Sequence, residues 1–198
     1  PQRLNASTLL AQSYHHQSRF ELAAALAAAR SAVAQAPEFG FAWARVAELE
    51  LSFGRTKRAM EALDQALQLA PRHAQAMTVK GFLLASQNHF ALALAQFDQA
   101  LIVDGALGNA WLGRGLCRIR QGHTREGAAD LLVAAAQEPN RALLRSYLGK
   151  AFDETGDTAL AVRELGYAKQ LDPNDPTAWL YSALLNQQRN RINEAIRD

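Results

Sequence analysis

The sequence predicts an all-α fold in which helical hairpins stack into a solenoid. Three observations lead to this prediction. Helix-breaking residues recur every 34 positions, small and apolar residues repeat with the same period, and glycine or asparagine recurs inside each period. Self-similarity with a period of about 20 to 50 residues is the signature of repeat architectures.

The 34-residue period is defined by Pro37, Pro71, Pro139 and Pro173, with Gly105 in the remaining place. Each of these residues interrupts helical structure, so a boundary recurs at every point of the grid. We therefore expect one solenoid domain, cut from a longer protein, with five full units and an incomplete sixth. The units cover residues 6–39, 40–73, 74–107, 108–141, 142–175 and 176–198.

Each unit contains two predicted amphipathic helices. Positions 4, 8 and 11 of the unit, and then positions 20, 24 and 27, are small or apolar at spacings of three and four, which places them on one face of a helix. Small residues at positions 8 and 20 allow the two backbones to approach closely. Position 20 holds Ala25, Ala59, Ala93, Gly127, Ala161 and Ala195.

Position 15 of the unit separates the two helices. In five units it holds Gly54, Asn88, Gly122, Gly156 or Asn190. Both residue types tolerate the left-handed backbone conformation that ends a helix. One hairpin cannot bury both of its faces, so we expect successive hairpins to stack in sequence order.

Residues 43–71 and 111–139 resemble the tetratricopeptide repeat family, whose pattern is W-x-x-L-G-x-x-Y, then A-x-x-x-F, A and P. The resemblance extends over almost the whole chain. The first unit departs most, with Leu9, Ser13 and His16 at positions 4, 8 and 11. The resemblance implies a right-handed α-α superhelix whose first helices line a concave face that binds other proteins.

On that concave face the first helices would present positions 2, 5, 6, 9, 12 and 13, which we call the first-helix stripe. The stripe is mostly apolar and aromatic, and an exposed apolar patch of this extent indicates a binding surface. Alternatively, its apolar residues cover the edges of neighbouring hairpins or mediate self-association. The residues expected to contact a peptide or protein partner are Tyr14, Phe41, Arg45, Glu48, Phe82, Leu116, Arg120, Leu143, Tyr147, Lys150, Tyr181 and Leu184.

Two charges lie where the repeat pattern favours leucine. Lys80 and Arg114 occupy position 7, and Arg118 follows on the same helix face as Arg114. They could form an anion site, but a charge near a core requires a partner. Asp130 at position 23 of the opposing helix is in reach of Arg114, so we expect an internal ion pair.

The composition excludes several classes of partner. With 21 basic and 19 acidic residues, the formal net charge of +2 provides no strong field to recruit nucleic acid. No apolar stretch approaches the ~20 residues needed for membrane insertion. The chain is typical of a soluble protein, cytoplasmic or periplasmic, and its 17 arginines against 4 lysines favour a GC-rich bacterial genome.

No catalytic, cofactor or metal-binding motif is found in the sequence. Cys117 is the single cysteine, which is most simply a small buried side chain. His89 and His123 share position 16, but without a third ligand nearby we expect exposed loop histidines rather than a metal site. No nucleophile–base arrangement or phosphate-binding loop is present.

The sequence thus predicts a noncatalytic scaffold that binds a peptide or protein segment, with no cofactor. Two alternatives remain open. The chain could be a homo-oligomerisation module that associates through the first-helix stripe or through the incomplete sixth unit. It could also be the regulatory or targeting arm of an enzyme whose catalytic domain lies outside residues 1–198.

Overall fold

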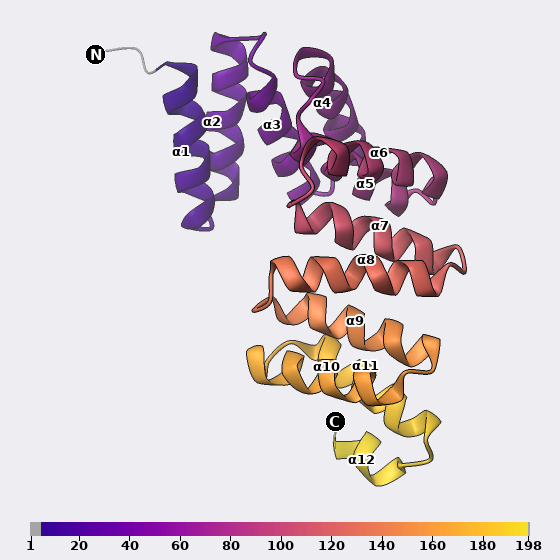
Figure 1. The fold of residues 1–198 in the computed structure, drawn as a ribbon. Helices are drawn as coiled ribbons and strands as arrows, with labels where there is room; N and C mark the ends of the chain where they lie inside the picture. Colours follow the sequence, from indigo (N-terminus) through magenta and orange to yellow (C-terminus); the bar gives the residue numbers. More distant parts are fainter. Residues whose placement is uncertain (1–4, 198) are drawn as a thin grey trace. The chain divides into compact units, whose positions relative to one another are not determined.

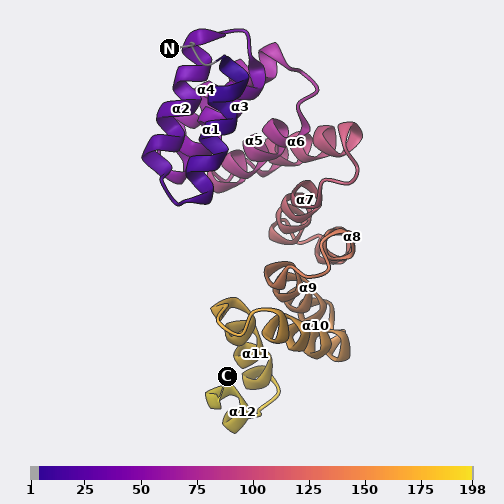
Figure 2. The same cartoon turned by 90° about the vertical axis from the view of Figure 1, so that its left-hand side faces the viewer.

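The computed structural model describes residues 5–197, and this part of the chain consists of helices and turns, with no β-strand (Figures 1 and 2). The predicted all-α class is confirmed. The helices are α1 (Ala6–Ser18), α2 (Leu22–Gln35), α3 (Gly40–Ser52), α4 (Thr56–Leu69), α5 (Ala74–Ser86), α6 (Phe90–Val103), α7 (Gly108–Arg120), α8 (Thr124–Gln137), α9 (Ala142–Thr155), α10 (Thr158–Leu171), α11 (Pro176–Gln188) and α12 (Ile192–Arg197).

The chain divides between Gly105 and Ala106 into two compact units. In the first unit, α1 pairs with α2, α3 with α4, and α5 with α6. In the second unit, α7 pairs with α8, α9 with α10, and α11 with α12. Within each unit the second helix of one hairpin contacts the first helix of the next, as the repeat pattern predicts (Figure 1).

Alanine and glycine allow the paired helices to lie close together. Ala25, Ala59, Ala93 and Ala161, all at position 20 of the repeat, are completely buried. In the α7–α8 hairpin, a Cβ added to Gly127 would lie 2.6 Å from the Gly115 carbonyl oxygen, closer than van der Waals contact allows. Large residues then fill the space around these contacts. The fully buried ones include Leu49, Leu63, Phe97, Leu131, Leu144, Leu148 and Leu165.

The turns between paired helices adopt the predicted left-handed conformation. The position-15 residues have φ angles of 71° (Gly54), 62° (Asn88), 87° (Gly122), 88° (Gly156) and 57° (Asn190). This confirms the role that the sequence assigns to position 15. The same conformation lets the chain reverse direction directly after each first helix.

Phe20 is the position-15 residue of the first unit, and its residue type does not predict its conformation. Its φ is 61°, although this left-handed conformation costs a residue with a Cβ roughly 1–2 kcal/mol. Its ring is 91% exposed, so no packing within the described residues compensates for the strain. The hairpin geometry therefore overrides the local preference of phenylalanine.

Replacing Phe20 by asparagine, the residue at the same position in two other units, is expected to stabilise the protein by about 1 kcal/mol. Urea denaturation followed by circular dichroism measures this change. The matched control is Phe20→Ala, which removes the ring but keeps a Cβ in the left-handed region and should bring little gain. Equal stability of Phe20→Asn and the parent would contradict the assignment of strain to this turn.

Candidate functional site

A pocket opens on the first helices α1, α3 and α5 of the first unit. We call it the Tyr14 pocket, and its volume is about 470 Å³. It lies on the face that the first-helix stripe predicts, and it contains three of the predicted contact residues. Its lining consists of Tyr14, Gln17, Arg45, Glu48, Leu49, Ser52 and Gln75.

Arg45 forms the floor of the Tyr14 pocket and connects α3 to α1. Its side chain is 2% exposed. Its guanidinium donates to the Ser13 hydroxyl at 3.0 Å, to the Gln17 side-chain oxygen at 2.6 Å and to the Glu48 carboxylate at 3.0 Å. The ring of Tyr14 covers the guanidinium, with 4.0 Å between Cζ and the ring centroid. Arg45 is therefore a buried brace of the pocket, not the exposed partner contact that the sequence predicts.

Tyr14 and Glu48 provide the accessible chemistry of the Tyr14 pocket. Tyr14 is 52% exposed, and the Glu48 side chain is 25% exposed. Partial burial raises the pKa of the Tyr14 phenol above its ordinary value, and the negative charge of Glu48 adds to this shift against the opposing effect of Arg45. The phenol is thus protonated at neutral pH, and the pocket combines an aromatic wall with a hydroxyl and a carboxylate.

The other stripe residues of the first unit have different environments. Phe41 is 54% exposed and lies against the His73 ring, with 4.4 Å between the ring centroids. Burial lowers the pKa of His73, so this imidazole is neutral at neutral pH. Phe82 is half-buried and meets the ring of Phe97 edge-on at 5.1 Å. Phe82 is therefore largely a packing residue.

In the second unit, the stripe residues of α9 and α11 lie side by side. Tyr147 and Tyr181 approach to 6.2 Å between ring centroids. Partial burial raises the pKa of the Tyr181 phenol above its ordinary value. Electrostatic interactions with Tyr147 and Glu154 add smaller increases. Lys150 forms ion pairs with Asp153 at 3.3 Å and Glu154 at 3.5 Å. The remaining predicted residues are Leu116 and Leu143, which are half-buried, and Arg120 and Leu184, which are exposed.

Acidic side chains of the same chain pair with the basic residues that lie near the core, and one of these acids, Asp130, is itself buried. Arg114 donates to Asp130 through two nitrogens, at 2.8 and 2.9 Å, which confirms the predicted ion pair. Arg118 joins the same carboxylate at 2.8 Å. Lys80 pairs with Asp64 of the preceding hairpin at 2.7 Å. Arg114, Arg118 and Lys80 thus pair with acidic side chains of the same chain and do not form an anion site.

Glu50 anchors a similar network that the repeat pattern does not predict. Its carboxylate is 2% exposed and accepts hydrogen bonds from Arg30 of α2 and from Arg55, the latter at 3.3 Å. Burial favours the neutral acid, but the hydrogen bonds from Arg30 and Arg55 outweigh it and hold the pKa of Glu50 below its ordinary value. Because the partners come from outside its helix, a one-dimensional pattern does not reveal the network.

Glu50→Gln is expected to lower the free energy of unfolding by about 1–2 kcal/mol at neutral pH, because two arginines lose a charged acceptor. A depressed folded-state pKa stabilises the fold above the unfolded pKa, and this stabilisation is lost as pH falls through the folded pKa. The gap between parent and variant should therefore begin to narrow as the pH falls below about 4. Urea denaturation from pH 7 to pH 3 measures it, with exposed Glu61→Gln as the control. A gap that stays constant over this range would contradict the assignment.

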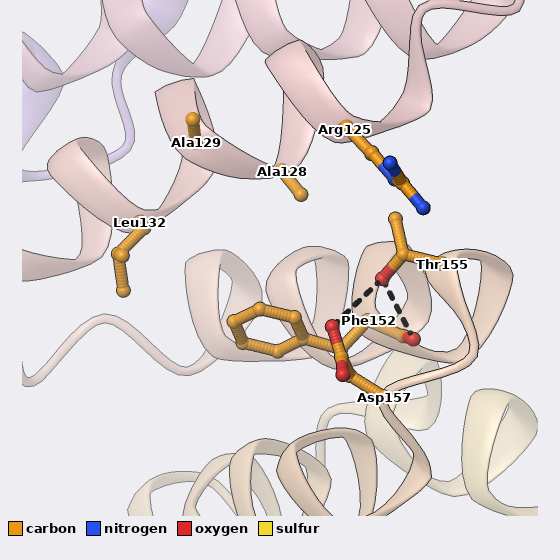
Figure 3. Close-up of a pocket in the computed structure, with 7 residues that line it drawn as sticks. All are labelled: Arg125, Ala128, Ala129, Leu132, Phe152, Thr155 and Asp157. Carbon is orange, nitrogen blue, oxygen red and sulfur yellow. Dashed lines mark hydrogen bonds between the residues drawn. The ribbon is translucent and has the colours of Figure 1, made fainter.

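A second pocket lies between α8 and α9, entirely within the second unit (Figure 3). We call it the Leu132 pocket, and its volume is about 400 Å³. Figure 3 shows Leu132 extending from α8 on the side of the Phe152 ring, with Arg125 and Thr155 at the other end. The lining residues are Arg125, Ala128, Ala129, Leu132, Phe152, Thr155 and Asp157.

The two loop histidines at position 16 and the cysteine lie in different environments. His89 and His123 are exposed, as predicted, and Cys117 is buried. Burial raises the pKa of the Cys117 thiol. Residues 5–197 contain no group of three or more histidine, cysteine or acidic side chains that could hold a metal ion. In the same part of the chain, none of the helices combines the length and apolar character that a bilayer crossing requires.

Comparison with known proteins adds sequence relatives and structural neighbours. Anaphase-promoting complex subunit 3 of Schizosaccharomyces pombe is 24% identical over 121 residues, which cover 61% of this chain and 18% of that protein. The present chain thus spans less than a fifth of the length of this curated relative.

Two solved structures share the fold over nearly the whole chain. A chain of the APC/C hetero-tetramer Cut9–Hcn1 superposes with a TM-score of 0.89 at 17% identity, covering 98% of this chain and 38% of that chain. PilW, a type IV pilus biogenesis factor, gives a TM-score of 0.86 at 21% identity, covering 97% and 89%.

The family assignment rests on the sequence as well as on the fold. A tetratricopeptide repeat family model matches residues 45–105. Helical hairpins of the same 34-residue period extend on both sides of this segment, and the structural neighbours include a thermophilic tetratricopeptide repeat protein of Thermus thermophilus. Residues 45–105 are therefore tetratricopeptide repeat sequence, and the described residues on both sides continue the same helical-hairpin fold.

Proposed function

We propose that this chain is a noncatalytic scaffold that holds a peptide or protein segment against its first helices. Tetratricopeptide repeat proteins are generally noncatalytic interaction scaffolds, and the structural neighbour Cut9–Hcn1 is itself an assembly of protein chains. The observation that carries the proposal is the Tyr14 pocket on α1, α3 and α5. Concave sites with a few convergent polar groups are the usual location of binding.

The hydrogen bonds of Arg45 determine what the Tyr14 pocket can offer a ligand. Arg45 directs its donors to Ser13, Gln17 and one oxygen of Glu48. The accessible part of the pocket therefore presents the carboxylate of Glu48 as a charged acceptor, while the Gln75 amide and the Tyr14 hydroxyl can each donate or accept. We infer that the ligand supplies hydrogen-bond donors, such as backbone N–H groups of an extended segment, and an apolar side chain.

The test is a selection of peptides on the intact chain. A phage-displayed library of random peptides, about a dozen residues long, is selected on the parent protein alone. Peptides that survive are titrated by fluorescence polarisation. We expect at least tenfold weaker binding to Tyr14→Ala, because an aromatic anchor at the centre of a contact typically contributes more than about 1.4 kcal/mol.

Matched variants separate recognition from stability. Glu48→Gln keeps an acceptor for Arg45 and removes the negative charge, so it should weaken binding of cationic peptides while preserving the fold. Ile102→Ala removes an equally apolar but remote side chain that is 84% exposed on α6, and it should leave binding unchanged. Phe82 is unsuited to this test because its ring packs on Phe97. Selected peptides that bind Tyr14→Ala and Glu48→Gln as tightly as the parent would refute the proposed site.

A further inference from the structure

Phe20 lies in the turn between α1 and α2 and is unusual in two respects. Its ring is 91% exposed, and its backbone is held in the left-handed region where other units carry glycine or asparagine. A strained outlier of this kind invites a functional explanation. Arg19 precedes Phe20 and Glu21 follows it, and their side chains form an ion pair at 3.0 Å. The turn therefore presents an exposed aromatic ring next to a pair of opposite charges.

The Leu132 pocket offers an apolar surface on which an aromatic ring such as that of Phe20 could pack. Its apolar part is made by Ala128, Leu132 and the ring of Phe152, and Leu132 is 50% exposed there (Figure 3). Phe152 packs against the buried cluster of Ala161, Leu165 and Leu185. At one end stands the guanidinium of Arg125, which forms no hydrogen bond or ion pair within residues 5–197. An open apolar surface beside a basic group is thus available.

Equivalent repeat positions at another junction explain why the Leu132 pocket is open. Positions 25, 11 and 16 at the junction of the first two hairpins hold the ion-pair network of Arg30, Glu50 and Arg55. At the junction of α8 and α9, the same positions hold Leu132, Phe152 and Asp157, which cannot form such a network. The small side chains of α8 then leave the space over Phe152 unfilled.

The charges around Phe20 complement those of the Leu132 pocket. With the ring of Phe20 seated on Leu132 and Phe152, the adjacent Glu21 matches Arg125, and Arg19 matches Asp157. In the isolated chain Arg19 and Glu21 pair with each other at 3.0 Å on the surface, and Glu21 is also hydrogen-bonded to the His16 ring at 2.7 Å. Docking therefore exchanges the Arg19–Glu21 pair for two new ion pairs with the pocket, while the phenyl ring leaves water.

We propose that the α1–α2 turn of one chain docks into the Leu132 pocket of a second copy. The two surfaces differ, so the contact is heterologous, and each chain retains one free turn or one free pocket after the first contact. A single aromatic anchor with flanking charges makes a small interface, so we expect a dissociation constant on the order of 0.1–1 mM. Association then becomes populated at high local concentration, as on a shared binding partner.

Sedimentation equilibrium over a concentration series up to about 1 mM tests this contact. The weight-average mass of the parent should rise above the 21.6 kDa of one chain. Phe20→Asn should stay monomeric although we expect it to be more stable than the parent, and Leu132→Glu should also stay monomeric. The controls Ile102→Asn and Val162→Glu change comparably exposed apolar residues elsewhere, and they should associate like the parent.

Mixing the two monomeric variants gives the decisive result. Phe20→Asn keeps an intact pocket and Leu132→Glu keeps an intact turn, so an equimolar mixture should form a 1:1 dimer and nothing larger. Ala129→Gln, which fills the pocket with a helix-favouring side chain, replaces Leu132→Glu if the latter does not fold. A parent that stays monomeric throughout the series, or a mixture that does not associate, overturns the proposal.

Discussion

Phe97→Ala is expected to lower the free energy of unfolding of the α1–α6 unit by about 3–5 kcal/mol. The ring of Phe97 is completely buried and lies directly on Gly81, where an added Cβ would come within 2.7 Å of it. Gly81 has no side chain that could move into the cavity, and Phe82 contacts the ring only edge-on, so much of the space should stay empty. The cavity therefore adds to the lost transfer free energy.

Tryptophan fluorescence during urea denaturation measures this loss locally. Trp43 is the only tryptophan of residues 1–105, so a background with Trp111→Phe and Trp179→Phe reports on the first unit. The control is Ile102→Ala on the same helix, whose side chain is 84% exposed and whose loss should change stability by less than about 0.5 kcal/mol. Similar effects of the two substitutions would show that the Phe97 side chain is not buried in the core.

Gly127→Ala is expected to destabilise the α7–α8 hairpin by about 2–4 kcal/mol, although alanine favours a helix. Its Cβ would lie 2.6 Å from the Gly115 carbonyl oxygen and 2.6 Å from Cγ1 of Ile119. The first of these neighbours is backbone and cannot rotate away. The two helices would have to separate, which disrupts packing along their length.

The same substitution at Gly166 provides a control in which the stability is expected to rise and not to fall. A Cβ added there meets no heavy atom within 4 Å. Gly166→Ala in α10 should therefore stabilise the protein by about 0.5–1 kcal/mol through helix propensity. Thermal denaturation of both variants, with Trp111 as the reporter for α7, measures the difference. Stabilisation by both substitutions would show that α7 and α8 are farther apart than the structure indicates.

The hairpins and their turns were predictable from the sequence because they depend on local periodicity. Gly54 and Asn88 mark left-handed turns through their own conformational preferences, and φ angles of 71° and 62° confirm it. The Arg114–Asp130 pair was also predictable, because both residues lie on facing sides of one hairpin. In these cases the relevant partners are set by position within a single 34-residue unit.

Other features depend on neighbouring hairpins and escape a one-dimensional pattern. The repeat pattern places Arg45 in the first-helix stripe, but in the structure it is buried and donates to Ser13 and Gln17 of the preceding hairpin. Within its own hairpin, Phe20 adopts a conformation that its residue type disfavours, so the residue type does not reveal it. The Leu132 pocket arises because the side chains of α8 above Phe152 are small. Small residues are common throughout the 34-residue pattern, so the pattern does not predict the pocket.

The brace formed by Arg45 links ligand recognition to local opening of the chain. If α1 detaches, a buried guanidinium loses its acceptors on Ser13 and Gln17, so the N-terminal hairpin and the Tyr14 pocket should open together. A peptide held in the pocket would then slow amide hydrogen exchange in α1 as well as in α3. Occupancy of the site can accordingly be measured by the exchange of backbone amides throughout α1, including those more than a turn away from Tyr14.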